Sequence, residues 1–78
     1  MLFNNPEDLN LTVASNVRFF RKSLSLSQRE FARVLGLNPL TYKGYEICKS
    51  AFPLYVLVLI CELYDLSLDD LVDPIFPL

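Results

Sequence analysis

The stretch SLSQREFARVLGLNPLTYKGYE contains two helix-start signals in close succession. Ser27 and Glu30 fit the capping-box pattern, in which a hydroxyl and a carboxylate each bond a free amide of the first turn. Gly36 predicts the end of that helix, because glycine adopts the left-handed conformation that follows many helices. Asn38 and Pro39 then predict the start of a second helix. The stretch therefore predicts two short helices joined by a tight turn.

The rest of the chain also shows helical patterns and no strand pattern. Apolar side chains recur at helical spacing over residues 12–23, which predicts a first helix. Further helices are expected over residues 53–64 and from Ser67, where Ser67 and Asp70 repeat the capping pattern. We therefore predict an all-α, compact five-helix domain over residues 12–73. Side chains expected to point into its core are Phe31, Val34, Leu35, Leu37, Tyr42 and Tyr45.

The two ends of the chain are expected to lie outside this domain. Residues 1–11 are interpreted as an N-terminal arm, because Pro6 and three asparagines disfavour regular structure. Residues 74–78, PIFPL, are interpreted as a tail, because two prolines disfavour a helix. No apolar run approaches the roughly 20 residues that cross a bilayer, and the start shows no signal-peptide pattern. The chain is therefore expected to be cytoplasmic.

The residue types argue against several kinds of functional site. The chain has no histidine and two cysteines, too few ligands for a structural zinc site, so no metal is expected. We expect Cys48 and Cys61 to be free thiols, with Cys61 in the core. No nucleophile is paired with a general base in the sequence. The chain is therefore not expected to be an enzyme or to need a cofactor.

Charge is distributed unevenly along the chain. All seven cations lie between residues 18 and 49, where only Glu30 and Glu46 oppose them, so this segment carries a net +5. Residues 50–78 carry five carboxylates and no cation, and the whole chain carries −2. Such a chain can present a basic face to a polyanion although it is acidic overall. The alternative is an ordinary solvated helical surface.

The order of these features resembles a known family. Arg21, the stretch SQREFARVLGL, the stretch NPLTYKGYE and the ending LSLDDL are similar to the Cro and phage-repressor type of helix-turn-helix, the XRE family, over about residues 13–72. The resemblance implies a lambda-repressor-like fold with a turn at residues 36–38 and a recognition helix at about residues 39–47. It also implies a dimeric DNA-binding transcriptional regulator, such as a repressor, without a cofactor.

The resemblance assigns roles to individual positions. Arg21 and Glu46 match an internal ion pair, and Gln28 matches a position that meets a phosphate. The positions that would face double-stranded DNA are Gln28, Arg29, Asn38, Pro39, Leu40, Thr41, Lys43, Gly44 and Lys49. Leu40 can only pack on a thymine methyl group, and Gly44 has no side chain, so few groups are available to read bases.

One departure from the family pattern lies after the recognition helix. Family members place a glycine in a left-handed turn where this chain has Cys48. A β-carbon in that conformation costs about 1 kcal/mol. Either the turn is built differently here, or the chain tolerates the strain.

Residues 53–64, PLYVLVLICELY, have apolar side chains on opposite sides of the expected helix. Leu54, Leu57, Val58, Cys61 and Tyr64 match the core positions of the family. The second apolar side is expected to form an interface together with the tail, through Tyr55, Val56, Leu59, Leu63, Ile75 and Phe76. The alternative is that apolar residues of the two ends fold back to cover this side.

Two functions of different kinds therefore remain open from the sequence. The first is a DNA-binding regulator of the Cro/repressor type that acts as a homodimer. The second is an antirepressor-like module that uses the same fold to bind another regulatory protein. The excess of apolar residues and the small number of base-reading groups support the second function. The resemblance in fold, the +5 segment and Gln28 favour the first, which is our prediction.

Overall fold

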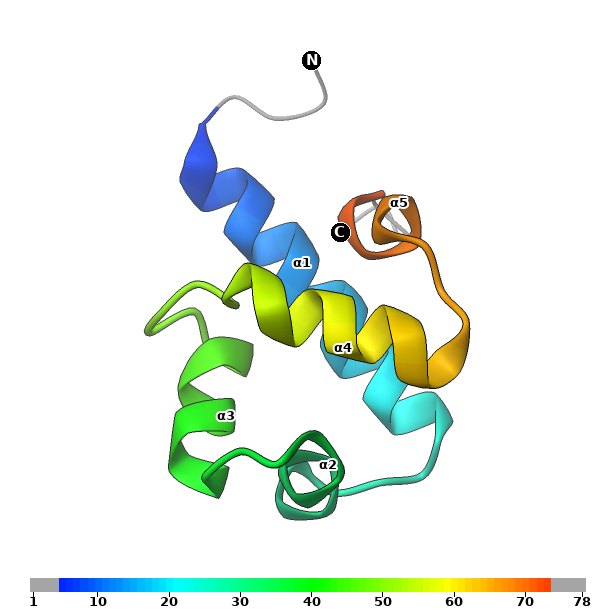
Figure 1. The fold of residues 1–78 in the computed structure, drawn as a ribbon. Coiled ribbons are helices and arrows are strands. Elements are labelled where there is room, and N and C mark those ends of the chain that lie inside the picture. The colour runs from blue at the N-terminus through cyan, green and yellow to red at the C-terminus, as the bar shows by residue number, and fades with distance from the viewer. Residues whose placement is uncertain (1–4, 74–78) are drawn as a thin grey trace.

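The computed structural model describes residues 5–73, and within them it shows helices and no strand (Figure 1). In chain order these are α1 (Pro6–Ser23), α2 (Gln28–Leu35), α3 (Pro39–Glu46), α4 (Leu54–Tyr64) and α5 (Leu68–Val72). In the view of Figure 1, α4 crosses α1, α2 and α3 lie together below them, and α5 packs against α1 and α4. The all-α, five-helix prediction is confirmed.

An apolar core joins the five helices. Its buried members are Val13, Val17, Phe31, Ala32, Leu35, Tyr42, Val56, Ile60 and Leu71. The rings of Phe31 and Tyr42 meet edge to face with their centroids 5.5 Å apart, which joins α2 to α3. Ala32 is completely buried, so a larger side chain there would displace its neighbours.

The first helix is longer than predicted. α1 begins at Pro6, so the predicted arm of residues 1–11 is wrong for residues 6–11. Asn5 caps the helix, because its Oδ1 accepts a hydrogen bond from the amide of Asp8 at 2.9 Å. Pro6 occupies the first helical position, where its missing amide hydrogen costs nothing. Proline therefore starts this helix instead of preventing it.

A buried asparagine joins α1 to the end of α5. The side-chain nitrogen of Asn16 donates hydrogen bonds to the carbonyls of Leu71 at 2.8 Å and Asp73 at 2.6 Å. These carbonyls lie in the last turn of α5 and just after it, where a helix leaves acceptors unsatisfied. Nothing in the sequence pattern indicated this contact, because it joins residues 55 and 57 positions apart.

The buried side of α4 differs from the predicted one. Val56 and Ile60 are completely buried, whereas Leu54 and Val58, which were expected in the core, are 67% and 37% exposed. Because nearly every side chain of α4 is apolar, periodicity alone does not indicate which side faces the core. Val56, predicted at an interface, is therefore a core residue.

Several other burial predictions need correction. Val34 was expected in the core, but it is 48% exposed. Four residues expected to be buried are half-buried, namely Leu37, Tyr45, Leu57 and Cys61. Burial in a domain of this size is limited, so many apolar side chains lie at the edge of the core.

Candidate nucleic-acid interface

Local capping fixes the geometry of α2, the turn and α3. The Ser27 hydroxyl accepts from the Glu30 amide at 3.0 Å, and the Glu30 carboxylate accepts from the Ser27 amide at 2.9 Å. Gly36 follows α2 in the left-handed conformation, with φ at 70°. Asn38 then caps α3, since its Oδ1 accepts from the amides of Leu40 and Thr41. The two predicted caps and the glycine stop are confirmed.

A buried ion pair holds the end of α3 against α1. The Nε of Arg21 donates to Oε2 of Glu46 at 2.7 Å, and its Nη2 donates to Oε1 at 3.0 Å. The Arg21 Nη1 also donates to the carbonyl of Leu26 at 2.6 Å. Burial acts to raise the pKa of Glu46, but the neighbouring Arg21, Tyr42 and Gln28 side chains outweigh it, so this pKa lies below its ordinary value. The predicted ion pair is confirmed.

Gln28, predicted to meet a phosphate, is part of the same network. Its Nε2 donates to Oε1 of Glu46 at 3.1 Å, and its side chain is half-buried. A carboxamide nitrogen carries two hydrogens, so one remains for a second acceptor. The ion pair with Arg21 therefore also restricts the orientation of Gln28 at the start of α2.

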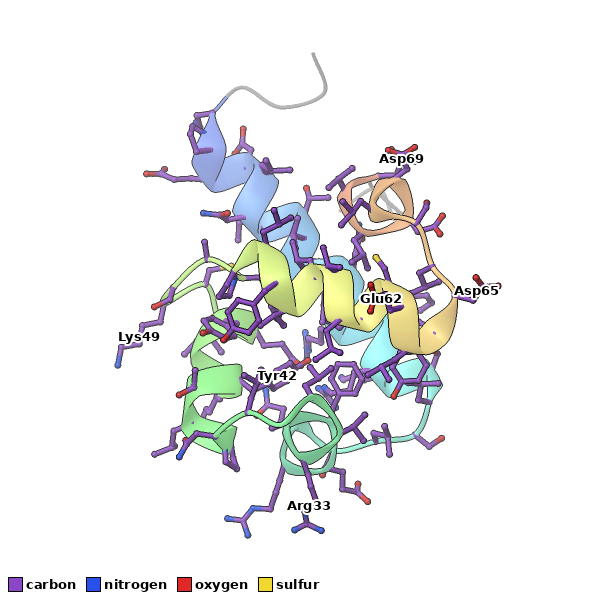
Figure 2. The ribbon with its side chains drawn as sticks, in the orientation of Figure 1. Arg33, Tyr42, Lys49, Glu62, Asp65 and Asp69 are labelled. Atoms are coloured by element: carbon purple, nitrogen blue, oxygen red, sulfur yellow. The ribbon has the colours of Figure 1, made fainter. Side chains whose placement is uncertain are left out.

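Tyr42 lies beside this network on the inner side of α3 (Figure 2). It is completely buried, and its ring packs against Phe31 and Phe52. Its hydroxyl makes no hydrogen bond within residues 5–73. Burial, and then the nearby Glu46 carboxylate, raise the pKa of Tyr42 well above its ordinary range. The hydroxyl is therefore protonated, and the prediction that Tyr42 points inward is confirmed.

The opposite side of α3 is open to solvent. Of the residues predicted to face DNA, those that are exposed are Arg29, Asn38, Pro39, Leu40, Thr41, Lys43 and Lys49. Gly44 is half-buried, and an added β-carbon would meet the Lys49 β-carbon at 3.9 Å, an ordinary contact. Glycine is therefore not sterically required at this position.

Two shallow hollows lie on the surface formed by α2 and α3. One is lined by Leu40, Thr41, Gly44, Tyr45, Lys49 and Ser50. The other is lined by Arg29, Arg33, Leu37 and Pro39. The first brings Lys49 together with three of the predicted α3 residues. The second adds Arg33, which the sequence interpretation did not include among the DNA-facing residues.

Cys48 adopts the left-handed conformation that the family assigns to glycine. Its φ is 63°, so the chain keeps the turn and carries the strain of a β-carbon. The turn directs the following amide of Lys49 to the Gly44 carbonyl at 2.8 Å. Lys49 is thereby placed next to the outer side of α3. Cys48 and Cys61 are both free thiols.

Positive and negative side chains are separated in space as well as in sequence. In Figure 2, Arg33 and Lys49 extend from α2 and from the segment after α3, whereas Asp65 and Asp69 lie on the far side near α5. The surface around α3 is therefore basic although the chain carries −2. No helix among residues 5–73 is long and apolar enough to cross a membrane. The same residues contain no cluster of three or more side chains suited to a metal ion.

Two capped helices joined by a tight turn, with the second helix exposed, define the helix-turn-helix class of DNA-binding proteins. Residues 17–71 match the helix-turn-helix family. The chain therefore belongs to the XRE-type, Cro/repressor family of DNA-binding transcription regulators. No curated protein and no solved structure matches the chain significantly.

Proposed function

We propose that this domain represses transcription by placing α3 in the major groove of double-stranded DNA as a homodimer. The observation that carries the proposal is the contrast between the two sides of α3. Tyr42 and Glu46 anchor its inner side, while Leu40, Thr41 and Lys43 on its outer side are exposed. A rigid helix with one free side is the element that enters the groove in this class.

The chemistry of the free side is suited to a limited reading of bases. Lys43 can donate to guanine O6 and N7 or to a phosphate, and Leu40 can contact a thymine methyl group. Asn38 can make fewer contacts with a base, because its side-chain oxygen already accepts hydrogen bonds from the amides of Leu40 and Thr41. A bidentate contact to adenine needs that oxygen as an acceptor, so Asn38 contributes only its nitrogen. Specificity therefore depends mainly on Lys43 and Thr41.

Dimerisation would double these contacts. The apolar side chains of α4 that remain exposed are Leu54, Tyr55, Val58 and Leu63, at 67%, 63%, 37% and 49%. Leu59 is half-buried beside them, whereas Val56 is excluded because it is in the core. Ile75 and Phe76, also predicted at the interface, lie outside the described residues. Two copies joined through α4 would be expected to place their recognition helices about 34 Å apart.

A second candidate function rests on the same exposed side of α4. An antirepressor-like module would use this apolar surface to bind another regulatory protein, and it would need few base-reading groups. Leu40, 79% exposed at the centre of the outer side of α3, also suits a protein contact.

A titration of labelled duplex DNA at two salt concentrations distinguishes the two functions. Lys43→Glu should weaken binding more than tenfold, because attraction is replaced by repulsion, and Lys43→Gln should lower the salt slope by about one. Lys22→Glu is the matched control, since it makes the same charge reversal on exposed α1. Equal affinity of the Lys43→Glu variant and the wild-type protein at low salt would favour the protein-binding module.

A further inference from the structure

Arg29 and Arg33 form an exposed arginine pair on α2. They are four residues apart, so both side chains extend from the same side of the helix. Together with Leu37 and Pro39 they line a surface hollow. Figure 2 shows Arg33 extending away from the core, beyond the end of the molecule formed by α2.

The charge of this arginine pair is largely uncompensated. Neither guanidinium makes a hydrogen bond or an ion pair with any residue in the range 5–73. The carboxylate of Glu30 is near Arg33, but it already accepts the Ser27 amide at 2.9 Å as part of the cap. Two cations therefore face solvent across the hollow with one partly engaged carboxylate beside them.

The far wall of the hollow belongs to the recognition helix. Pro39 is the first residue of α3, and Leu37 lies in the turn before it. When the second helix of a helix-turn-helix lies in the major groove, the first helix crosses the sugar-phosphate backbone. The hollow would then face the strand that borders the groove. A guanidinium can hold a phosphate through two parallel hydrogen bonds, which also fixes its orientation.

We propose that Arg29 and Arg33 clamp the phosphodiester backbone of one DNA strand at the edge of the groove occupied by α3. Arg33 is thereby a DNA-contacting residue, and Arg29 acts with it rather than alone. This inference rests on the proposed DNA binding and adds the contact that fixes the position of α3. Because the phosphates carry no sequence information, the clamp contributes affinity and register but not base preference.

The salt dependence of DNA binding tests the clamp directly. The probe is a fluorescein-labelled duplex of mixed sequence, about three helical turns long, titrated between about 50 and 200 mM salt. Each phosphate contact adds about 0.9 to the slope of log affinity against log salt. The double variant Arg29→Gln/Arg33→Gln should therefore lose about two from the slope, and each single variant about one. Arg18→Gln, an exposed cation on α1, is the matched control and should change the slope by less than half a unit.

The possible outcomes separate the clamp from the proposed function. If the wild-type protein binds with a steep slope that the double variant retains, the clamp is wrong and DNA binding stands. The arginine pair would then be available to an acidic protein surface. If the wild-type protein does not bind the duplex even at low salt, the proposed function and the clamp both fail. Circular dichroism melting of every variant confirms that a lost slope does not reflect unfolding.

Discussion

The guanidinium of Arg21 holds both carboxylate oxygens of Glu46, at 2.7 and 3.0 Å, from a position 25 residues earlier in the chain. This contact joins the end of α1 to the last residue of α3. The side chains of Arg21 and Glu46 are 8% and 1% exposed, so water does little to replace the bond. The direction of α3 therefore depends on a residue that does not itself face the outer side of this helix.

Removing Arg21 should destabilise the fold strongly. Arg21→Met leaves the Glu46 carboxylate buried with only the Gln28 amide as a side-chain donor, and we expect a loss of about 3–5 kcal/mol in the free energy of unfolding. Adding Glu46→Leu should recover a large part of this loss, because the unpaired charge is gone. Urea denaturation measures both variants, with Arg18→Gln as a surface control. A loss below about 1 kcal/mol for Arg21→Met would mean that the pair is solvated.

Stability should decrease in acid through Glu46. Its folded pKa lies below the ordinary value of 4.5, so the unfolded chain takes up the proton first as pH falls. The stabilisation is complete above that value and is lost as pH falls through the folded pKa. Urea denaturation between about pH 7 and pH 3 should show a steeper decline for the wild-type protein than for Glu46→Gln. If the unfolding free energies of the two proteins change equally with pH, protonation of Glu46 does not contribute to the loss of stability in acid.

Replacing Cys48 by glycine should stabilise the protein. The φ of 63° disfavours any residue with a β-carbon, and we expect a gain of about 0.5–1 kcal/mol. Cys48→Ala removes the thiol but keeps the β-carbon, so it should leave stability nearly unchanged. Thermal melting of the two variants separates the strain from the loss of sulfur. Equal stability of the two variants would contradict this explanation.

Truncating the Asn16 side chain should weaken the packing of α5 against α1. Asn16→Ala removes the donor to the carbonyls of Leu71 and Asp73, and we expect a loss of about 1–3 kcal/mol. Native-state hydrogen exchange should show the largest loss of protection in Leu68–Val72. Uniform loss of protection across all helices would instead indicate a general effect on the core.

Charge on the outer side of α4 should separate a dimer into monomers. Tyr55 is 63% exposed, so Tyr55→Glu should fold normally while placing a charge in the proposed interface. Full burial of such a side chain contributes about 1.5–3 kcal/mol before association costs. Leu11→Glu, at a 54% exposed position on α1, makes the same type of change elsewhere. Sedimentation equilibrium should show a dimer for the wild-type protein and for Leu11→Glu, and a monomer for Tyr55→Glu. A monomeric wild-type protein would contradict the proposed interface.

Local signals in the sequence were sufficient to predict two short helices joined by a tight turn, and the start of α5. Ser27, Gly36, Asn38 and Ser67 act on residues within one turn, so their effect is readable without the rest of the fold. The resemblance to the family supplied the ion pair between distant helices, which no local pattern contains. DNA contacts at the outer side of α3 stay a prediction.

The errors occurred where tertiary packing decides the outcome. α4 is apolar on most sides, so only its contact with the neighbouring helices determines that Val56 is buried and Leu54 is exposed. Pro6 disfavours a helix interior but suits a helix start, and the Asn5 cap selects the second role. The hydrogen bond between Gln28 and Glu46 could not be predicted from the sequence either, because it depends on how α2 and α3 approach each other.

The separation of Arg33 and Lys49 from Asp65 and Asp69 affects how the protein approaches a polyanion. The molecule is 34 Å long, whereas charges in physiological salt are screened beyond about 8 Å. A DNA duplex therefore responds to the nearest side of the protein and hardly to its net charge of −2. Collisions that lead with the acidic side are repelled before contact, and those that lead with α3 are attracted. The separation of charge therefore favours an approach through the side that carries α3, and an isoelectric point near 4.8 does not prevent that approach.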